Sequence, residues 1–307
     1  MKIRKALSYD DVLLVPTNTS VRSRNDCVTY SKFNFGYTST PGVQSYQPLQ
    51  PLIASPMSTV CDTDMCVEMY KNRCLGILHR GHPYEDLKNK LVAVSFLQAA
   101  GVKHFGVAIG SQDKDFDDAR QLIVVGVPVI CVDVANGHNT HVANFVSRLR
   151  KLSGNKCHIM AGNVAGSDGF KLLAESGADS VRIGIASGAG CSTASNTGVG
   201  MPTFQSIVDC VEWRERNYNP HGHVSIIADG GCKSSGDLAK AIAAGADFVM
   251  AGSLFAGTSA SPGKLMWMNK TTQQISDKRP LRKVSMNDIY GRVVGDVDVE
   301  VNDETAI

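Results

Sequence analysis

The stretch Ala174-Glu-Ser-Gly-Ala-Asp-Ser-Val181 returns later in the chain as Ala243-Ala-Gly-Ala-Asp-Phe-Val249. Each copy has the pattern of a helix end, a glycine turn and the start of a strand, because glycine commonly ends helices and β-branched residues favour strands. A chain that repeats this unit is expected to alternate helices with strands.

Short apolar runs recur through the rest of the chain, and we expect them to be strands. Each run is too short for a helix and apolar throughout, as is typical of parallel strands buried on both faces. Amphipathic helical patterns lie between them; the clearest are 167–177, with Ser167 or Asp168 as its cap, and 235–245. The eight runs cover residues 51–54, 75–78, 104–108, 128–132, 158–161, 180–183, 224–228 and 248–251.

Eight strand–helix units in succession imply a closed (β/α)8 TIM barrel, an α/β fold with parallel strands. We expect one domain over residues 1–307, with the barrel itself over about 51–258. Residues 1–50 should wrap one end of the barrel, and residues 297–301 alternate as an exposed strand would. A doubly wound open sheet is the alternative, but no Gly-x-Gly-x-x-Gly follows the first strand.

The composition is that of a globular protein with a balanced surface. Apolar residues make up 43% of the chain, charged residues 20%, and the net charge is +2, so no basic field for nucleic acid is expected. The nine cysteines are scattered and odd in number, and no Cys-x-x-Cys occurs, which argues against disulfides and zinc. No apolar run has signal-peptide or membrane-spanning length. We therefore expect a cytoplasmic protein without a membrane or nucleic-acid partner.

One cysteine stands apart from the others. Cys191 lies near the centre of a glycine-rich stretch, residues 184–202, that follows the sixth predicted strand. The loops at the carboxyl ends of barrel strands carry the chemistry in this type of fold. A loop thiol beside exposed backbone N–H groups can become a nucleophile. Core packing does not require five glycines around a thiol, so we expect Cys191 to be catalytic and the other eight cysteines to be inert.

Glycines also follow the last two predicted strands. Asp229-Gly230-Gly231 ends the seventh strand and Gly252-Ser253 ends the eighth. Barrels build phosphate sites at these two strand ends from backbone N–H groups and a short helix N-terminus. Asp229 suits a carboxylate that accepts both hydroxyls of a ribose. Ordinary tight turns are the alternative.

Polar residues follow three further predicted strands. Asp133-Val-Ala-Asn-Gly-His138 follows the fourth strand, where a role in binding competes with a structural Asx turn. Gly162-Asn163-Val164 repeats this arrangement after the fifth. His79-Arg80 ends the second strand, and Arg80 is expected to contact either a phosphate or dinucleotide, or a surface carboxylate.

With these residues the sequence resembles the inosine monophosphate (IMP) dehydrogenase and guanosine monophosphate (GMP) reductase family. The resemblance runs from about Leu7 to about Tyr290 and implies a barrel, usually assembled as a homotetramer, that binds a small purine nucleotide. The motifs that carry it are Ser8-Tyr-Asp-Asp-Val-Leu-Leu-Val-Pro16, Ser23-Arg24, Ile53-Ala-Ser-Pro-Met57, Val132-Asp-Val-Ala-Asn-Gly137, Gly162-Asn-Val164, the Cys191 stretch, Ile227-Ala-Asp-Gly-Gly231 and Gly252-Ser-Leu-Phe-Ala-Gly257.

The resemblance implies a role for each matching position. Cys191 would attack C2 of the purine to form a thioimidate adduct, and Thr193 would help to move the proton of departing ammonia. The implied nucleotide contacts are Ser55 and Met57 at the purine, Asp229 at the ribose, Gly230, Gly231, Gly252 and Ser253 at the phosphate, and additionally Gly188, Tyr290 and Gly291. The implied cofactor contacts are Asp133, Val134 and Ala135 along the nicotinamide half, Arg80 and Asn163, and Ser23 and Arg24, the last two reaching a cofactor in a neighbouring subunit. The carbonyls of Ala186, Gly188 and Cys191 match positions where the family can bind a monovalent cation such as K⁺.

Several features resemble the reductase branch of the family. Dehydrogenases usually carry a pair of regulatory domains inserted after the second strand, whereas residues 79–105 hold no insertion. Thr197-Gly-Val-Gly-Met-Pro202 and Ser253-Leu-Phe-Ala-Gly257 also look like reductases. The resemblance therefore implies conversion of GMP to IMP and ammonia with NADPH, or with NADH, as the hydride donor. The alternatives are a compact dehydrogenase that oxidises IMP to XMP with NAD, or a purine nucleotide binder with an altered substrate.

The sequence departs from the family pattern in three places. The reductase flap supplies a Glu followed by Gly and the dehydrogenase flap an Arg-Tyr pair, whereas Val293-Val294-Gly295 has neither. Ala189 replaces a serine that often touches the phosphate, and Tyr290-Gly291-Arg292 matches a Tyr-x-Gly segment only in part. A lost proton relay typically costs roughly 10²–10⁴ in rate, so we expect slow ammonia release or another base.

Overall fold

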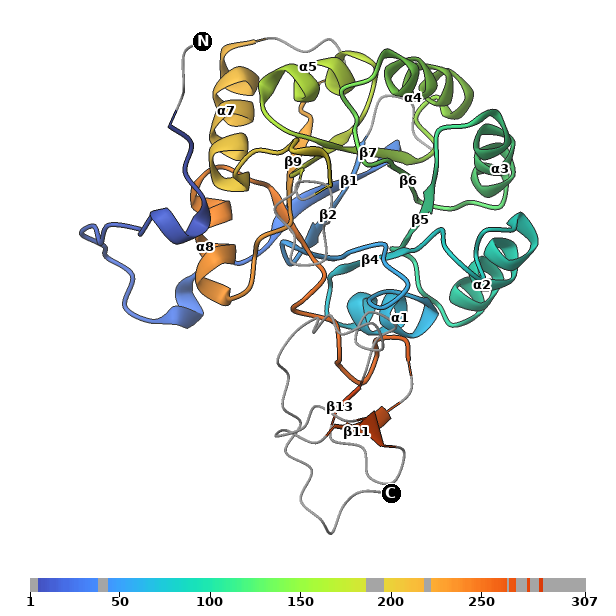
Figure 1. The fold of residues 1–307 in the computed structure, drawn as a ribbon, viewed down its shortest axis with the longest axis horizontal. Helices are drawn as coiled ribbons and strands as arrows, with labels where there is room; N and C mark the ends of the chain where they lie inside the picture. The colour runs from blue at the N-terminus through green and yellow to red at the C-terminus, as the bar shows by residue number, and fades with distance from the viewer. Residues whose placement is uncertain are drawn as a thin grey trace.

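Eight parallel strands close into a ring in the computed structural model, which describes residues 5–37, 44–185, 196–217, 222–263, 265–268, 275–276 and 282–283. The helices that connect the strands lie around the outside of this ring (Figure 1). In order around the ring the strands are β10 (Phe248–Ala251), β3 (Leu52–Ala54), β4 (Leu75–Leu78), β5 (Gly106–Ile109), β6 (Val129–Asp133), β7 (His158–Val164), β8 (Ser180–Ile183) and β9 (Ser225–Asp229). The helices are α1 (Thr63–Lys71), α2 (Leu87–Ala99), α3 (Asp113–Val124), α4 (Thr140–Ser153), α5 (Ser167–Glu175), α7 (Thr203–Arg216) and α8 (Ser235–Ala243).

The predicted (β/α)8 barrel is thus confirmed. Strands β4, β8 and β10 coincide with the apolar runs at 75–78, 180–183 and 248–251. Strand β7 continues to Val164, three residues beyond its predicted end, because the chain through Asn163 stays in the sheet. The predicted helices at 167–177 and 235–245 are α5 and α8, each two residues shorter at its end.

The start of helix α5 differs from the prediction. Ser167 is already its first helical residue, and the cap position is Gly166, whose φ is +75°. Glycine adopts this φ without steric cost but has no side chain with which to cap the helix. The prediction that Ser167 or Asp168 caps α5 was therefore wrong. Helix α8, by contrast, begins with a capping box between Ser234 and Asp237.

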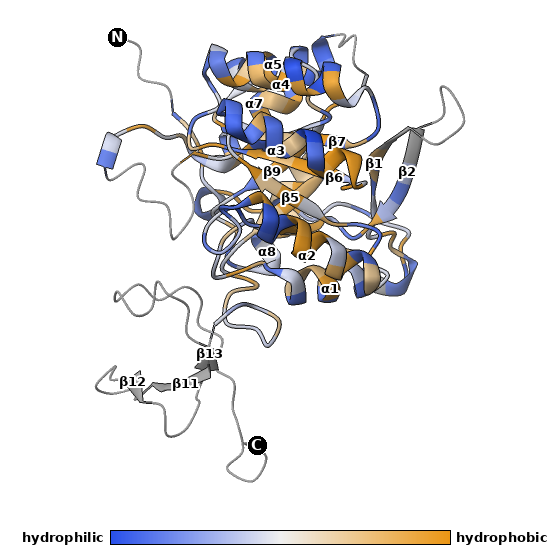
Figure 2. Cartoon of the chain, turned by 90° about the vertical axis from the view of Figure 1, so that its right-hand side faces the viewer, coloured by the Kyte–Doolittle hydropathy of each residue, from blue (hydrophilic) through white to orange (hydrophobic). Residues whose placement is uncertain are grey.

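Side chains along each barrel strand alternate between the inside of the ring and the surrounding helices. In β6, Val129 and Cys131 pack inside the ring, whereas Ile130 and Val132 pack in the layer beneath the helices. Figure 2 shows the apolar strands inside helices whose outer faces are largely hydrophilic. This alternation fixes which side chains reach the interior at the carboxyl ends of the strands.

A β-hairpin closes the amino-terminal end of the barrel. It consists of β1 (Ser31–Tyr37) and β2 (Gln44–Leu49), which pair antiparallel. Phe33 is fully buried, stacks on His158 at 4.3 Å between ring centroids and meets Phe248 edge to face at 5.2 Å. Strands β1 and β2 therefore cover one barrel end, the role predicted for residues 1–50 as a whole, although their polar composition did not predict strands.

The two copies of the Gly-Ala-Asp phrase make the same set of contacts. Asp179 and Asp247 each accept a hydrogen bond from a backbone N–H of the preceding strand, at 2.6 and 2.7 Å. Each also pairs with an arginine from the helix before that strand, Arg150 in the last turn of α4 and Arg214 in the last turn of α7. These arginines also donate to the carbonyls of the turn glycines. The repeated phrase therefore ties a helix end to a strand start twice.

The remaining described segments bear on three other predictions. Seven of the eight described cysteines are buried, as expected for packing residues, whereas Cys27 is exposed. None of the helices in the described part of the chain is long and apolar enough to cross a membrane. Beyond the barrel, β11 (Leu265–Met268) pairs antiparallel with β12 (Ile275–Ser276) and β13 (Arg282–Lys283). The predicted strand at 297–301 lies outside the described residues.

Candidate active site

The strand register brings three charged side chains to one level inside the barrel. Asp133 pairs with Gly162 across β6 and β7, and Gly162 pairs with Arg182 across β7 and β8. Arg182 pairs in turn with Ile227 of β9, two residues before Asp229. Residues two apart share a face of a strand, and Ile227 packs inside the ring, so Asp229 also faces the interior. The three side chains meet at the carboxyl end of the barrel, where this fold places its chemistry.

Arg182 joins the two carboxylates at the centre of this layer. Its Nη1 donates to Asp133 Oδ1 at 2.6 Å, and its Nε and Nη2 donate to Asp229 Oδ2 at 3.0 and 2.8 Å. Only 5% of Arg182 is exposed, and a buried guanidinium requires such partners because an unpaired buried charge is costly. Sequence reasoning missed this residue. The signal was present, since an arginine inside an apolar barrel strand must have charged partners nearby.

Arg80 approaches the same cluster from the end of β4. Its Nε donates to Asp133 Oδ2 at 3.2 Å, so the carboxylate contact, one of the two alternatives for this residue, is present. Burial alone would raise the pKa of Asp133, but the guanidinium groups of Arg182 and Arg80 outweigh it and hold that pKa below its ordinary value. Burial likewise opposes the charge of Arg182, but Asp229 and Asp133 raise its pKa. Asp133 and Arg182 therefore both carry charge at neutral pH.

Asn163 links the cluster to the neighbouring loop. Its Nδ2 donates to Asp229 Oδ2 and to the carbonyl of Gly184, each at 2.8 Å. The adjacent Gly162 allows this close approach, because a Cβ there would lie 2.5 Å from the Cβ of Arg182 and 2.9 Å from its carbonyl oxygen. Glycine at 162 is therefore a packing requirement of the charged layer. Asn163, at the polar end of the fifth predicted strand, thus lies at the centre of the charged layer.

The segment after β6 is fastened to β7 through its backbone. The N–H of Val134 donates to the carbonyl of Gly162 at 2.9 Å, and the N–H of Asn163 donates to the carbonyl of Val134 at 2.8 Å. Val134 is half-buried, and Ala135 is exposed at the rim. Ala135 is therefore open to a ligand, while its position is set by the strand beneath it.

Asn136 and His138 form a structural turn after β6. The N–H of His138 donates to Asn136 Oδ1 at 3.0 Å, which is the Asx turn given as the alternative for this loop. Nε2 of His138 accepts from the N–H of Ala165 at 2.9 Å. A Cβ at Gly169 would lie 2.6 Å from the His138 ring. Asn136 and His138 therefore stabilise the loop after β6 against the segment after β7.

The predicted purine and phosphate positions lie at the ends of β3, β9 and β10. Ser55 is buried, and its N–H donates to the carbonyl of Ala251 at 3.1 Å, which ties the loop after β3 to β10. A Cβ at Gly252 would lie 3.2 Å from Met57 Sδ and 3.9 Å from Ser55 Oγ, so the structure brings these three residues together.

Two consecutive glycines follow Asp229 with backbone angles that favour glycine. Gly230 and Gly231 have φ values of +93° and +85°. Ser253 lies on the neighbouring turn after β10, and its Oγ donates to the carbonyl of Cys232 at 3.4 Å. The turns after β9 and β10 therefore lie side by side, as a phosphate site built from both requires.

One predicted position, Ser23, is not brought to this rim, and several others lie outside the described residues. Ser23 is exposed on the amino-terminal segment, which runs outside α8 in Figure 1, and it begins a short 3-10 helix by accepting from the N–H of Asn25. Ser23 does not join the strand-end cluster. The side chain of Arg24 and the residues Ala186, Gly188, Cys191, Thr193, Tyr290 and Gly291 lie outside what the structure describes.

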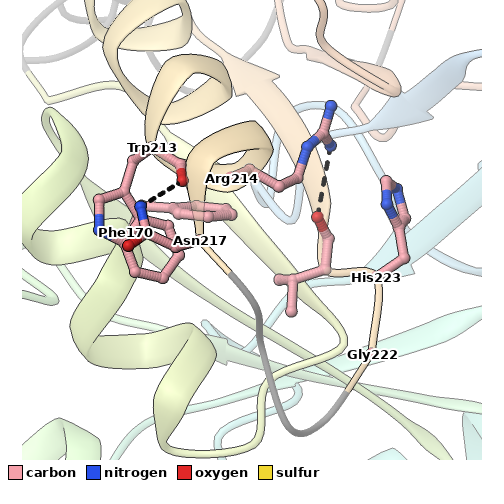
Figure 3. A pocket seen from close by; sticks show the side chains of 7 residues that line it. Phe170, Trp213, Arg214, Asn217, Gly222 and His223 are labelled. Atoms are coloured by element: carbon pink, nitrogen blue, oxygen red, sulfur yellow. Dashed lines mark hydrogen bonds between the residues drawn. The ribbon is translucent and has the colours of Figure 1, made fainter.

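One described hollow lies far from the charged layer in the fold. It has a volume of about 320 Å³ and sits beside the end of α7 and the start of β9, at the amino-terminal end of the strands. Figure 3 shows Trp213, Arg214 and His223 around it, with Asn217 Nδ2 donating to the Trp213 carbonyl at 2.7 Å. Arg214 belongs to the Arg–Asp pair with Asp247 described above. Barrels use this end for stability rather than for chemistry.

Comparisons with known proteins show which family and which solved structure this chain resembles. The profile of the IMP dehydrogenase / GMP reductase domain matches residues 6–278. A protein named GMP reductase from Shigella boydii is 34% identical over 86% of this chain and 72% of its own length. One of the same name from Buchnera aphidicola is 34% identical over 85% of this chain and 71% of its own. A crystal structure of inosine 5′-monophosphate dehydrogenase from Legionella pneumophila superimposes with a TM-score of 0.69 at 33% identity, over 86% of this chain and 74% of that one.

Proposed function

The chain belongs to the IMP dehydrogenase / GMP reductase family of oxidoreductases, and from this premise we propose that it reduces GMP to IMP and ammonia with NADPH. The overall reaction consumes one GMP, one NADPH and two protons, and yields IMP, NADP⁺ and an ammonium ion. The relatives named GMP reductase, at 34% identity, support the reductase branch.

The observation that carries the proposal is the arrangement of hydrogen bonds around Asp229. Every described hydrogen bond to this carboxylate reaches Oδ2, from Arg182 Nε and Nη2 and from Asn163 Nδ2. Among the described residues none donates to Oδ1, which remains an acceptor at a strand end. A fixed carboxylate with one open oxygen suits the two hydroxyls of a ribose. We therefore assign Asp229 to the ribose of the nucleotide.

The turns after β9 and β10 are the proposed phosphate site. Backbone N–H groups of glycine turns bind phosphate well, because no side chain blocks the approach of the oxygen atoms. Gly230 and Gly231 would supply them from one turn, and Gly252 and Ser253 from the other. The purine would then extend over Ser55 and Met57, which the structure brings next to Gly252.

Asp133, Val134 and Ala135 are the proposed contacts of the nicotinamide half of the cofactor, with Arg80 and Asn163 beside them. The fit rests on the exposed edge at Ala135 and on the rigid backbone pairing of Val134 with β7. Bound here, the reduced nicotinamide supplies a hydride to C2 of the purine. The residues of the chain orient it, and Asp133 stays charged next to it because two arginines hold its pKa low. We propose NADPH in preference to NADH, and contact with Ser23 and Arg24 of a neighbouring subunit in a homotetramer.

The proposed reaction begins at Cys191. Its sulfur forms a bond to C2 of GMP, and the amino group leaves C2 as ammonia after a proton has been moved with the help of Thr193. Hydride arrives at C2 of the adduct, the C–S bond then breaks, and IMP leaves with the thiolate restored. The carbonyls of Ala186, Gly188 and Cys191 are the proposed ligands of K⁺. Without the flap Glu we expect a slow release of ammonia.

The reductase proposal is tested by following absorbance of the reduced nicotinamide with GMP and NADPH, and separately with IMP and NAD⁺. Loss of absorbance with GMP is the expected result. Cys191→Ala should abolish turnover yet leave GMP binding within a few-fold, because the ribose and phosphate contacts are intact. Cys27→Ala is the matched control, since Cys27 is exposed and is not among the proposed contacts; its turnover should equal that of the unmodified chain.

Three outcomes would change the assignment. Gain of absorbance with IMP and NAD⁺, and none with GMP, would make the chain a compact dehydrogenase. No change of absorbance in either assay, with GMP still bound, would make the chain a nucleotide binder without this activity. Full turnover by Cys191→Ala would remove the proposed adduct whatever the substrate.

A further inference from the structure

The amino-terminal motif over residues 8–16 belongs to the family resemblance but has no part in the proposed reaction. It begins with the 3-10 helix η1 (Tyr9–Asp11), which lies beside α7 and α8 (Figure 1). The N–H and Oγ of Ser8 both donate to Asp11 Oδ2, at 2.7 and 2.6 Å, and so hold this turn in shape. Within the turn Tyr9 is only 4% exposed, whereas the side chain of Asp10 is 80% exposed. Tyr9 is therefore the side chain through which the turn packs on the barrel.

The ring of Tyr9 packs on the start of helix α7. It meets Phe204 edge to face, with 6.1 Å between the ring centroids. Beside it, the N–H of Gln205 donates to the carbonyl of Leu7 at 3.0 Å. Phe204 and Gln205 both belong to the first turn of α7. The amino-terminal segment therefore holds this turn through a ring contact and a backbone hydrogen bond.

The start of α7 is also the end of the glycine-rich stretch that contains Cys191. Soon after β8, Ile185 forms an antiparallel bridge with Met201, near the other end of the stretch. The N–H of Met201 donates to the carbonyl of Ile185 at 3.3 Å. We call this pair the base of the Cys191 stretch. Only Pro202 separates the base from α7, so contacts that fix the first turn of α7 also fix the base.

Tyr9 reaches the proposed phosphate turn on its other side. Burial raises the pKa of its hydroxyl, and the neighbouring thiol of Cys232, directly after Gly231, raises that pKa further. The carbonyl of Tyr9 accepts from Lys240 Nζ of α8 at 2.9 Å. Tyr9, Met201 and Gly231 line one hollow of about 370 Å³. The base of the Cys191 stretch and the phosphate turn therefore border the same space, and Tyr9 lies between them.

We propose that Tyr9 is a positioning residue, which holds the base of the Cys191 stretch in a fixed place beside the phosphate turn at Gly230 and Gly231. The proposal rests on the proposed function, because it takes the nucleotide phosphate to be bound at this turn and Cys191 to attack C2 of the purine. Tyr9 touches neither ligand, but its ring sets how the two elements that carry the reacting groups stand relative to each other. Attack by a nucleophile depends steeply on such placement.

Steady-state kinetics with GMP and NADPH tests this role in two variants of Tyr9. Tyr9→Leu removes the ring, and kcat should fall roughly 10- to 100-fold, the cost of a small misplacement of reacting groups. KM for GMP should stay within a few-fold, because the proposed ribose and phosphate contacts come from other residues. Tyr9→Phe keeps the ring and should retain the kcat of the unmodified chain, since it loses only the hydroxyl.

Phe33→Leu is the matched control. Phe33 is fully buried, like Tyr9, but it lies at the amino-terminal end of the barrel, opposite the candidate site. Both leucine variants lose a buried ring, so both should lose stability. Only Tyr9→Leu should lose kcat per folded molecule, and circular dichroism gives the folded fraction of each variant.

Hydrogen exchange tests the same role without any nucleotide. The N–H groups of Met201 and Gln205 are the hydrogen bonds that close the base and hold the first turn of α7. Their exchange, followed by mass spectrometry of peptides that cover residues 201–205, should be several-fold faster in Tyr9→Leu than in the unmodified chain, because local opening becomes easier. Tyr9→Phe and Phe33→Leu should exchange there as the unmodified chain does.

The results separate this proposal from the proposed function. Faster exchange in Tyr9→Leu alone supports the fastening of the base, even if GMP is not a substrate. Equal exchange in Tyr9→Leu and Phe33→Leu overturns the proposal. In a chain that reduces GMP, a kcat for Tyr9→Leu no lower than that for Phe33→Leu, or a loss confined to KM, also overturns it. Failure of the unmodified chain to reduce GMP counts against the proposed function, and the exchange measurement then decides on Tyr9 by itself.

Discussion

Nε and Nη2 of Arg182 donate to the same oxygen of Asp229, Oδ2, while Nη1 of Arg182 reaches Asp133 on the opposite side. One guanidinium therefore holds the proposed ribose carboxylate and the proposed cofactor carboxylate in fixed positions. Nucleotide and cofactor would meet across this residue. The same contact leaves the other oxygen of Asp229 without a described donor and so sets which edge of the carboxylate a ligand meets.

Arg182→Lys should impair both ligands. Lysine keeps the charge but lacks the planar fork, so it cannot hold both carboxylates as arginine does. We expect kcat/KM to fall roughly 10- to 100-fold, the loss of a charged hydrogen bond, with KM raised for nucleotide and cofactor alike. Arg148→Lys is the control, because Arg148 is half exposed and pairs with exposed Asp113. Steady-state kinetics with each substrate varied would contradict the idea if both variants behaved alike.

Gly162→Ala should disturb the same layer from the backbone side. The new Cβ would lie 2.5 Å from the Cβ of Arg182, and neither atom belongs to a flexible end of a side chain. Overpacking of this kind costs about 1–3 kcal/mol, so we expect a lower free energy of unfolding in urea together with reduced turnover. Gly236→Ala, at the start of α8, meets only Ser234 Oγ at 3.5 Å and should be neutral or slightly stabilising. Equal stability of the two variants would refute the steric argument.

The ion pair between α2 and α3 tests how much it costs to leave a buried charge without its partner. Lys90 Nζ lies 2.8 Å from Asp118 Oδ2, and the two side chains are only 2% and 12% exposed. Lys90→Met should lower the free energy of unfolding by about 3–5 kcal/mol, because Asp118 would be left buried without its partner. The double variant Lys90→Met, Asp118→Leu should recover most of that loss. Denaturant titration of the unmodified chain, of Lys90→Met, of Asp118→Leu and of the double variant gives the coupling free energy. A double variant no more stable than Lys90→Met would count against this reading.

Stability should fall as the pH drops from about 6.5 to about 4. Burial lowers the pKa of His79 from its ordinary value to about 4, so the unfolded chain takes up a proton before the folded chain does. The stability present above pH 6.5 is therefore lost progressively below it, by less than the ceiling of about 1.4 kcal/mol per pH unit for one group, since solvent screens part of the effect. His104 and His158 act in the same direction.

His79→Phe isolates the contribution of one ring. Phenylalanine keeps the edge-to-face contact with Tyr84, at 4.9 Å between centroids, and removes the titration. Urea unfolding at several pH values should show a shallower decline in this variant than in the unmodified chain. Identical slopes would show that His79 titrates at the same pH in both states.

The barrel could be predicted from the sequence because its signal is local. Apolar runs such as 180–183 and glycine turns such as Gly245 recur along the chain and need no knowledge of distant partners. The hairpin at 31–49 could not be predicted in the same way. Its alternating polar residues become strands only because Phe33 and Leu49 bury themselves against the barrel end, which is a tertiary effect.

Some residues of the candidate site could be predicted from the sequence, and others could not. Residues at strand ends, among them Asp133 and Asp229, were found because parallel strands in a barrel end at one rim. Arg182 was missed because it lies within a strand, and only the register shows that it stands between two carboxylates. The role of Cys191 rests on its glycine-rich surroundings and on the family resemblance, and it stays a prediction.

The hairpin at the amino-terminal end has a consequence for the order in which the chain folds. Phe33 belongs to the buried cluster inside the ring, which runs from Ile53 near one end of the barrel sequence to Met250 near the other, and its ring meets that of Phe248. Its burial therefore cannot be complete until the first and last strands have met, a contact between remote parts of the chain that forms slowly. A fluorine label on Phe33 would consequently report the closing step of folding, and a chain released from synthesis would keep this side chain solvated until its final strand had emerged.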